Sequence, residues 1–101
     1  MTVWTSVGPA AELATLSLAT IGALDIALAR LEDGSFAAFD DTCTHEECSL
    51  SEGDLEGDRV VCFCHGSEFD VRTGAVLQGP ADQPVRVYET RVAGGELEVL
   101  V

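Results

Sequence analysis

The chain has few positive charges and no lysine. Its 101 residues include 18 acidic side chains against five arginines, and the formal net charge is −13 at pH 7. Phosphate backbones and anionic lipid head groups repel so acidic a protein. The composition therefore argues against nucleic acid and membrane surfaces as partners, and it favours a partner with a basic face.

Long hydrophobic runs and targeting signals are also lacking. The most apolar stretch, residues 13–24, is shorter than the roughly 20 residues that a membrane-spanning helix needs. Residues 1–4 contain none of the basic side chains that open a secretory signal peptide. We therefore expect a soluble, cytoplasmic protein with no membrane anchor.

Repeats, low-complexity tracts and linkers are missing as well, so the length predicts one domain, residues 1–101. Residues 10–31 are rich in alanine and leucine, and propensity alone would predict a helix there. The imperfect alternation of apolar side chains over residues 24–30 favours a strand instead. Asp33-Gly34 then predicts a hairpin turn into a second strand over residues 35–39.

Further short strands with turn signals between them follow along the chain. They are expected at residues 16–20 and 59–61, as a hairpin over residues 68–77, at residues 85–88, and as a hairpin about Gly94-Gly95. Residues 9–13 are expected to form a turn or a single helical turn. Many short strands with regular turn signals predict an all-β sandwich or a small barrel.

Two short motifs combine cysteine with histidine. They are Cys43-Thr44-His45 and Cys62-Phe63-Cys64-His65, with sixteen residues between His45 and Cys62. Each motif offers one thiolate and one imidazole, so two such motifs can hold two irons, one by the cysteines and one by the histidines. Zinc remains an alternative, although zinc motifs usually pair like ligands. A second alternative is that the four cysteines form two disulfides, which would be expected only in a secreted chain.

This ligand spacing resembles that of the Rieske iron–sulfur family. The similarity continues through Gly66-Ser67-Glu68-Phe69-Asp70 and through Gly79-Pro80-Ala81, which is similar to the family's proline-containing loop. It extends from about residue 31 to residue 87. The resemblance implies an antiparallel β-sandwich or barrel base with a small inserted cluster-binding subdomain, about residues 42–81.

The resemblance also implies one Rieske-type [2Fe-2S] cluster and its ligands. Cys43 and Cys62 are expected to bind the buried iron. His45 and His65 are expected to bind the outer iron, near the surface. Replacing two thiolates by two imidazoles raises the potential of a [2Fe-2S] cluster from about −400 mV to roughly −150 to +300 mV.

Three residues are expected to tune the cluster. High-potential members of the family carry a serine and a tyrosine hydroxyl two and four residues after the second histidine, where this chain has Ser67 and Phe69. With one hydroxyl missing, we expect a low-to-intermediate potential. The alternative role for Ser67 is that of a loop residue that bonds local backbone. Pro80 is expected to be a rigid lid that excludes water from one side of the cluster, although the segment could also be a simple turn.

Cys48 and Cys64 remain. In the quinol-oxidising branch of the family, cysteines at these positions form a disulfide that ties the two ligand loops together, whereas typical dioxygenase ferredoxins lack the pair. The resemblance therefore implies a Cys48–Cys64 bridge. Two small buried thiols are the alternative, because a cytoplasmic disulfide is uncommon.

The function implied by the resemblance is electron transfer without catalysis. The chain resembles the ferredoxin of a bacterial aromatic-ring-hydroxylating dioxygenase system. Its partners would be an NAD(P)H-dependent flavoprotein reductase, which donates one electron, and a terminal Rieske non-haem iron oxygenase, which accepts it. Acidic residues between positions 40 and 58 could steer such partners or form only a solvated face. The alternatives are a small [2Fe-2S] subunit of a nitrite reductase-like complex and, in other classes, a zinc-stabilised interaction module or a disulfide-stapled secreted domain.

Overall fold

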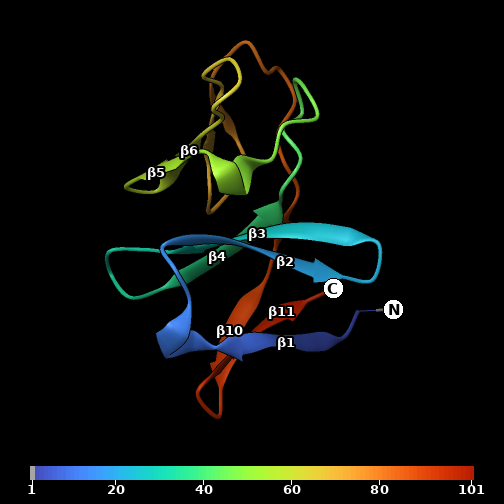
Figure 1. Ribbon diagram of the computed structural model, residues 1–101, viewed down its shortest axis with the longest axis vertical. Helices are drawn as coiled ribbons and strands as arrows, with labels where there is room; N and C mark the ends of the chain where they lie inside the picture. Colours follow the sequence, from blue (N-terminus) through green and yellow to red (C-terminus); the bar gives the residue numbers. More distant parts are fainter. Residues whose placement is uncertain (1) are drawn as a thin grey trace.

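The computed structural model describes residues 2–101, and nearly all of their regular structure is β-strand (Figure 1). The strands are β1 (Trp4–Pro9), β2 (Leu16–Ile21), β3 (Leu24–Arg30), β4 (Phe36–Asp40), β5 (Asp54–Glu56), β6 (Arg59–Val61), β7 (Glu68–Asp70), β8 (Val76–Gln78), β9 (Val87–Tyr88), β10 (Thr90–Ala93) and β11 (Glu96–Leu100). Two single turns of 3-10 helix, η1 (Ala10–Glu12) and η2 (Leu50–Glu52), interrupt them. Across residues 2–101, no helix is long and apolar enough to cross a membrane. The fold class is all-β, as predicted.

The strands form three antiparallel sheets. The first has the order β1-β11-β10, the second β2-β3-β4-β9 and the third β5-β6-β7-β8. Figure 1 shows the first two sheets together at one end of the molecule, with both chain ends beside them, and the third sheet at the other end. The chain enters the third sheet after β4 and returns from it to β9, so the third sheet is an insertion between two strands of the second.

Strand β3 explains why residues 10–31 resemble a helix in composition. All four residues from Ile26 to Ala29 are buried. Ile26 and Leu28 belong to the core shared with β11, whereas Ala27 and Ala29 belong to the core shared with the third sheet. A strand covered on both faces has little need of polar residues, so its period of two is weak. Tertiary packing here outweighs the helix propensity of alanine and leucine.

The predicted turns define most of the hairpins. Strand β2 ends one residue later than expected, and β3 and β4 pair on either side of Asp33-Gly34. The hairpin over residues 68–77 is present as β7 and β8, and Gly94-Gly95 joins β10 to β11. The strand expected at residues 85–88 is shorter, because only Val87 and Tyr88 pair with β4. Strands β1 and β5 were not predicted as strands.

Ion pairs and a buried hydrogen bond support the inserted sheet and the strands beside it. Arg72 forms ion pairs with Asp58 at 2.8 Å and with Asp33, in the β3–β4 turn, at 3.2 Å. Tyr88 donates a hydrogen bond to Asp40 at the end of β4. Burial and the Asp40 carboxylate raise the pKa of Tyr88 to about 12, so its phenol keeps the proton that it donates. The Arg72–Asp33 pair therefore links the inserted sheet to the β3–β4 turn, whereas the Tyr88–Asp40 bond joins β9 to the end of β4.

Candidate metal centre

The first Cys/His motif lies in a pinched loop that follows β4. Asp41 is buried and its carboxylate accepts hydrogen bonds from the Ser49 hydroxyl and, at 2.8 Å, from the Ser51 amide. The Cys43 amide donates to the Cys48 carbonyl at 2.9 Å. These bonds close the loop at its base, so its tip is presented away from the core with Cys43 on the inside.

The second motif forms a tight turn directly after β6. The Cys62 amide donates to the Ser67 carbonyl at 2.8 Å, and the Gly66 amide donates back to the Cys62 carbonyl at 3.0 Å. Gly66 has a φ of +77°, a conformation that a side chain strongly disfavours. This turn leaves Cys62 buried and His65 on the surface.

The loop containing Pro80 is fastened to both motifs. The Ala81 amide donates to the Ser67 hydroxyl at 3.0 Å, and the Thr44 hydroxyl donates to the Gln83 carbonyl at 2.6 Å. The peptide bond between Gly79 and Pro80 is cis. Pro80 is exposed, so it lies on the outer side of this loop while Ala81 is buried beneath it.

The four expected ligands come together as two different pairs. Cys43 and Cys62 are free thiols, 3% and 2% exposed, and lie near enough to each other that Cys43 helps to raise the pKa of the Cys62 thiol. His45 and His65 are exposed, with ring centroids 5.5 Å apart. A buried sulfur pair beside an exposed nitrogen pair fits a two-iron group with unlike irons, whereas a single zinc would need all four donors around one point.

The environment of Cys62 also suits a sulfur that is bound by metal. Burial raises the pKa of the Cys62 thiol, while backbone amides of Cys64 and His65 that donate to its sulfur act in the opposite direction. Amides that point at a sulfur stabilise its negative charge. The residues present therefore fit a [2Fe-2S] cluster at this position.

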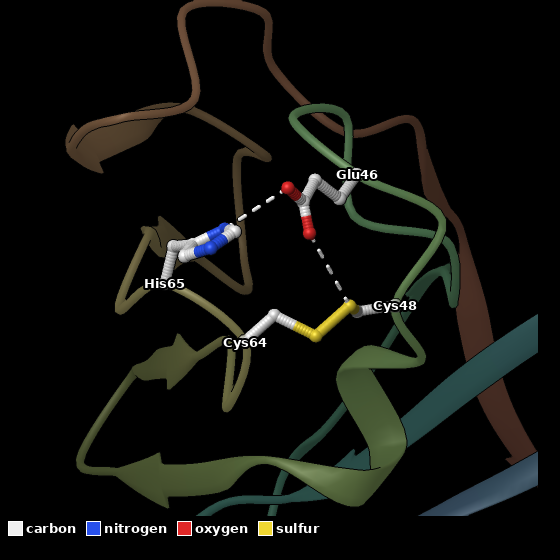
Figure 2. The surroundings of a disulfide bond; sticks show 4 residues. All are labelled: Glu46, Cys48, Cys64 and His65. Atoms are coloured by element: carbon white, nitrogen blue, oxygen red, sulfur yellow. Dashed lines mark hydrogen bonds and ion pairs between the residues drawn. A yellow bond between two sulfur atoms is a disulfide. The ribbon is translucent and has the colours of Figure 1, made fainter.

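Cys48 and Cys64 are joined by a disulfide, with their Cα atoms 6.5 Å apart (Figure 2). This is the pairing that the resemblance implied, and it ties the first loop to the second. Because Cys43 and Cys62 stay free, the structure does not support two disulfides. Glu46 lies beside the bridge, with one carboxylate oxygen 3.2 Å from His65 Nδ1 and the other 4.0 Å from Cys48 Sγ.

The expected tuning residues occupy different environments. Ser67 is 1% exposed and its hydroxyl faces the Pro80 loop through the bond from Ala81. Phe69 is fully buried in the core beneath the two motifs, so it contributes packing and no hydrogen bond. A tyrosine hydroxyl at this position would be the missing second donor.

Sequence reasoning missed four residues of this region. They are Asp41 and Thr44, which fasten loops, Glu46, which contacts the disulfide, and Phe63, whose ring is exposed on the second motif. Only Thr44 and Phe63 could have been found from the sequence, because each lies between two expected ligands in the chain. The contacts of Asp41 and Glu46 depend on the conformation of irregular loops, and such loops have no repeating residue pattern from which contacts could be predicted.

Comparison with known proteins identifies the family. The model of the Rieske [2Fe-2S] domain matches residues 3–89. Ferredoxin CarAc of Metapseudomonas resinovorans is 44% identical over 79 residues, which are 78% of this chain and 73% of that protein. The biphenyl dioxygenase ferredoxin subunit of Pseudomonas sp. (strain KKS102) is 48% identical over 68 residues, which are 66% of this chain and 62% of that protein.

A solved structure agrees with the sequence matches. A chain in the complex of reduced oxygenase and oxidised ferredoxin in carbazole 1,9a-dioxygenase superposes with a TM-score of 0.88 at 39% identity, covering 94% of this chain and 99% of that one. The matched chain therefore shares nearly all of this fold. The protein belongs to the Rieske [2Fe-2S] domain family and carries one [2Fe-2S] cluster of the Rieske type.

Proposed function

We propose that the protein is the ferredoxin of a bacterial aromatic-ring dioxygenase system. It takes one electron from an NAD(P)H-dependent flavoprotein reductase and passes it to the Rieske centre of a terminal non-haem iron oxygenase. The observation that carries this proposal is the exposure of both imidazoles, with the His65 side chain 52% exposed. An electron that leaves through an exposed ligand needs to cross only the contact with the partner.

The roles of the site residues follow from their burial. Cys43 and Cys62 hold the inner iron, and His45 and His65 hold the outer iron. When bound, the cluster supplies a one-electron couple. Residues 42–81 form the cluster-binding subdomain within the single domain, 1–101. Its own side chains hold the cluster, and the loop with Pro80 excludes water from one side.

Electron transfer is the whole activity of this chain. Its matched relatives are named as ferredoxin components, so the catalysis in their systems is performed elsewhere. A surface groove of about 330 Å³ is lined by residues of β4, β9 and the turn after β7. None of the Cys/His residues lines it, so it offers no place for a reaction at the cluster.

The relatives also decide between the candidate functions. A relative that is 48% identical is named as the ferredoxin subunit of a dioxygenase, which favours the dioxygenase shuttle over a nitrite reductase-like subunit. The complex with an oxygenase in the carbazole system supports the same acceptor class. We infer a cytoplasmic location because the proposed reductase draws on NAD(P)H.

A redox titration followed by mixing tests the proposal. We expect a rhombic electron paramagnetic resonance signal to appear on reduction, within the Rieske range of roughly −150 to +300 mV and towards its lower end. Chemically reduced protein is then mixed with the oxidised oxygenase of carbazole 1,9a-dioxygenase as a probe acceptor. Loss of the ferredoxin signal within the turnover time of that oxygenase supports the proposal. A strongly positive potential, or a signal that persists after mixing, argues for another acceptor.

Phe63 is expected to be an apolar anchor in docking. Its ring is 58% exposed, although it lies between Cys62 and Cys64 at the cluster. Truncating a central aromatic residue of an interface costs about 1–2 kcal/mol, so Phe63→Ala should raise the KM of the oxygenase for this ferredoxin roughly 5–30-fold. The reduction potential should stay unchanged, because the ring is no ligand. Steady-state assays with varied ferredoxin concentration measure the effect.

Leu18→Ala is the matched control for this prediction. Leu18 is a similarly exposed apolar side chain, 51%, but lies on β2, away from the inserted sheet. It should leave the KM unaltered. Equal effects of the two substitutions would remove Phe63 from the docking surface.

A further inference from the structure

Strand β2 forms one edge of the second sheet and carries no charge along its six residues, Leu16–Ile21. The Thr15 carbonyl accepts a hydrogen bond from the Arg30 amide of β3. Because backbone groups alternate between the two sides of an antiparallel strand, this bond fixes which residues of β2 face β3 and which face outward. The outward residues are Leu16, Leu18 and Thr20. Within residues 2–101, no strand pairs with this outer side of β2.

The other sheet edges all have features that hinder pairing with a further strand. Strand β5 has acidic side chains at Asp54 and Glu56, and β10 carries Arg91. The register of β1 and of β8 is irregular, β1 also ends at Pro9, and β9 is two residues long. Charges, bulges, proline and shortness are the means by which proteins protect sheet edges. Among the strands of residues 2–101, the edge strand that lacks all of them is β2.

We propose that β2 pairs with β2 of a second copy of this chain, antiparallel, so that two four-stranded sheets become one continuous sheet. Leu18 is the middle one of the three outward residues, so a two-fold axis at Leu18 pairs all of them. Leu18 then lies opposite its own copy, and Leu16 lies opposite Thr20 of the second copy. The remaining cross-strand pairs are Ser17–Ala19 and Thr15–Ile21. Leu18, which is 51% exposed, gains an apolar neighbour in this arrangement.

The charge of the chain indicates why the occupant is a second copy. Each copy has a formal net charge of −13, and like charges placed opposite each other destabilise paired strands. None of the cross-strand pairs at β2 contains a charged residue, whereas pairing through β5 would bring Asp54 and Glu56 against an equally acidic copy. A partner with a basic face finds no complementary charge on β2. The uncharged edge therefore suits another acidic chain better than it suits the basic partners expected for electron transfer.

Pairing through β2 leaves the cluster-binding end free. Figure 1 shows β2 among the two sheets at one end of the molecule and the inserted sheet at the other end. The Cys/His motifs and Phe63 therefore stay open to electron partners in the pair, and the inference stands or falls separately from the proposed function. One pair of short strands buries less than the roughly 1,000 Å² of a stable interface, so we expect a dissociation constant on the order of 100 µM.

Sedimentation of the cluster-loaded wild type tests the proposal over a range of protein and salt concentrations. We expect a monomer–dimer equilibrium whose dimer fraction rises with salt, because screening weakens the repulsion between two acidic copies. Leu18→Lys places two positive charges opposite each other and should weaken association at least about tenfold. Val92→Lys is the matched control, since Val92 is 54% exposed on the edge strand β10 and the change in net charge is the same. It should associate like the wild type.

Hydrogen exchange in the wild type extends the test to a protein with no substitution. The amides of Leu16, Leu18 and Thr20 should exchange several-fold more slowly at high than at low protein concentration, and the amides of β10 should not. A protein that stays monomeric at millimolar concentration in high salt, association that weakens with salt, or equal loss of association in both lysine variants would overturn the proposal. Protection of the β2 amides only after addition of an oxygenase would also overturn it, because the occupant would then be a strand of that partner.

Discussion

Replacing Cys62 by serine is expected to abolish cluster binding. Cys62 is 2% exposed, and burial raises the pKa of its thiol while the Cys64 and His65 amides act in the opposite direction. The position therefore suits a sulfur whose negative charge a bound metal neutralises. A serine hydroxyl ionises far less readily than a thiol and is a much harder ligand than sulfur. Purified Cys62→Ser should contain less than about a tenth of the wild-type iron, with no rhombic signal after reduction.

A serine variant of the disulfide is the matched control. Cys48→Ser combined with Cys64→Ser makes the same replacement of sulfur by oxygen in the same two loops, but neither residue is a proposed ligand. The double variant should keep most of its iron and its rhombic spectrum, with a lower temperature of cluster loss because one tie between the loops is gone. If Cys62→Ser retained a Rieske spectrum, the ligand assignment would be wrong.

The fold could be predicted to the extent that its signals are local. Turn pairs such as Asp33-Gly34 and Gly94-Gly95 determine hairpins from a few neighbouring residues, and both hairpins are present. Strand β5 could not be found this way, because its three residues alternate acidic and apolar side chains within an acidic loop. Its only support is its pairing with β6. The shortening of the strand expected at residues 85–88 has the same cause, since β4 offers just two partners there.

The candidate site could also be predicted only in part. Ligand candidates were visible because cysteine and histidine at short spacing are rare outside metal sites and disulfides. What lies around them was not visible. Thr44 donates to Gln83, which is 39 residues away in the chain, and Glu46 reaches His65 across two loops. Contacts of this kind depend on how three irregular loops fold against one another, for which residue spacing carries no information.

Replacing Ser67 by alanine is expected to lower the reduction potential. Ser67 is 1% exposed and its oxygen accepts from the Ala81 amide, so its own hydroxyl hydrogen is free for another acceptor. Cys62, five residues earlier in the same turn, would hold the cluster, and a cluster sulfur would be an acceptor suited to this burial. Hydrogen bonds to charged groups are worth about 1.5–3 kcal/mol, and for one electron about 1.4 kcal/mol equals 59 mV. The potential should therefore fall by roughly 65–130 mV.

Thr44→Val separates this effect from a loosened loop. Both substitutions remove one hydrogen bond to the loop that contains Pro80, at Ala81 or at Gln83. Only Ser67→Ala also removes a hydroxyl that can donate to the cluster, so only it should shift the potential by tens of millivolts in a spectroscopic redox titration, while both should lower thermal stability. Equal shifts in the two variants would mean that loop position sets the potential. A Ser67→Ala potential within about 20 mV of the wild type would mean that the hydroxyl only accepts from Ala81.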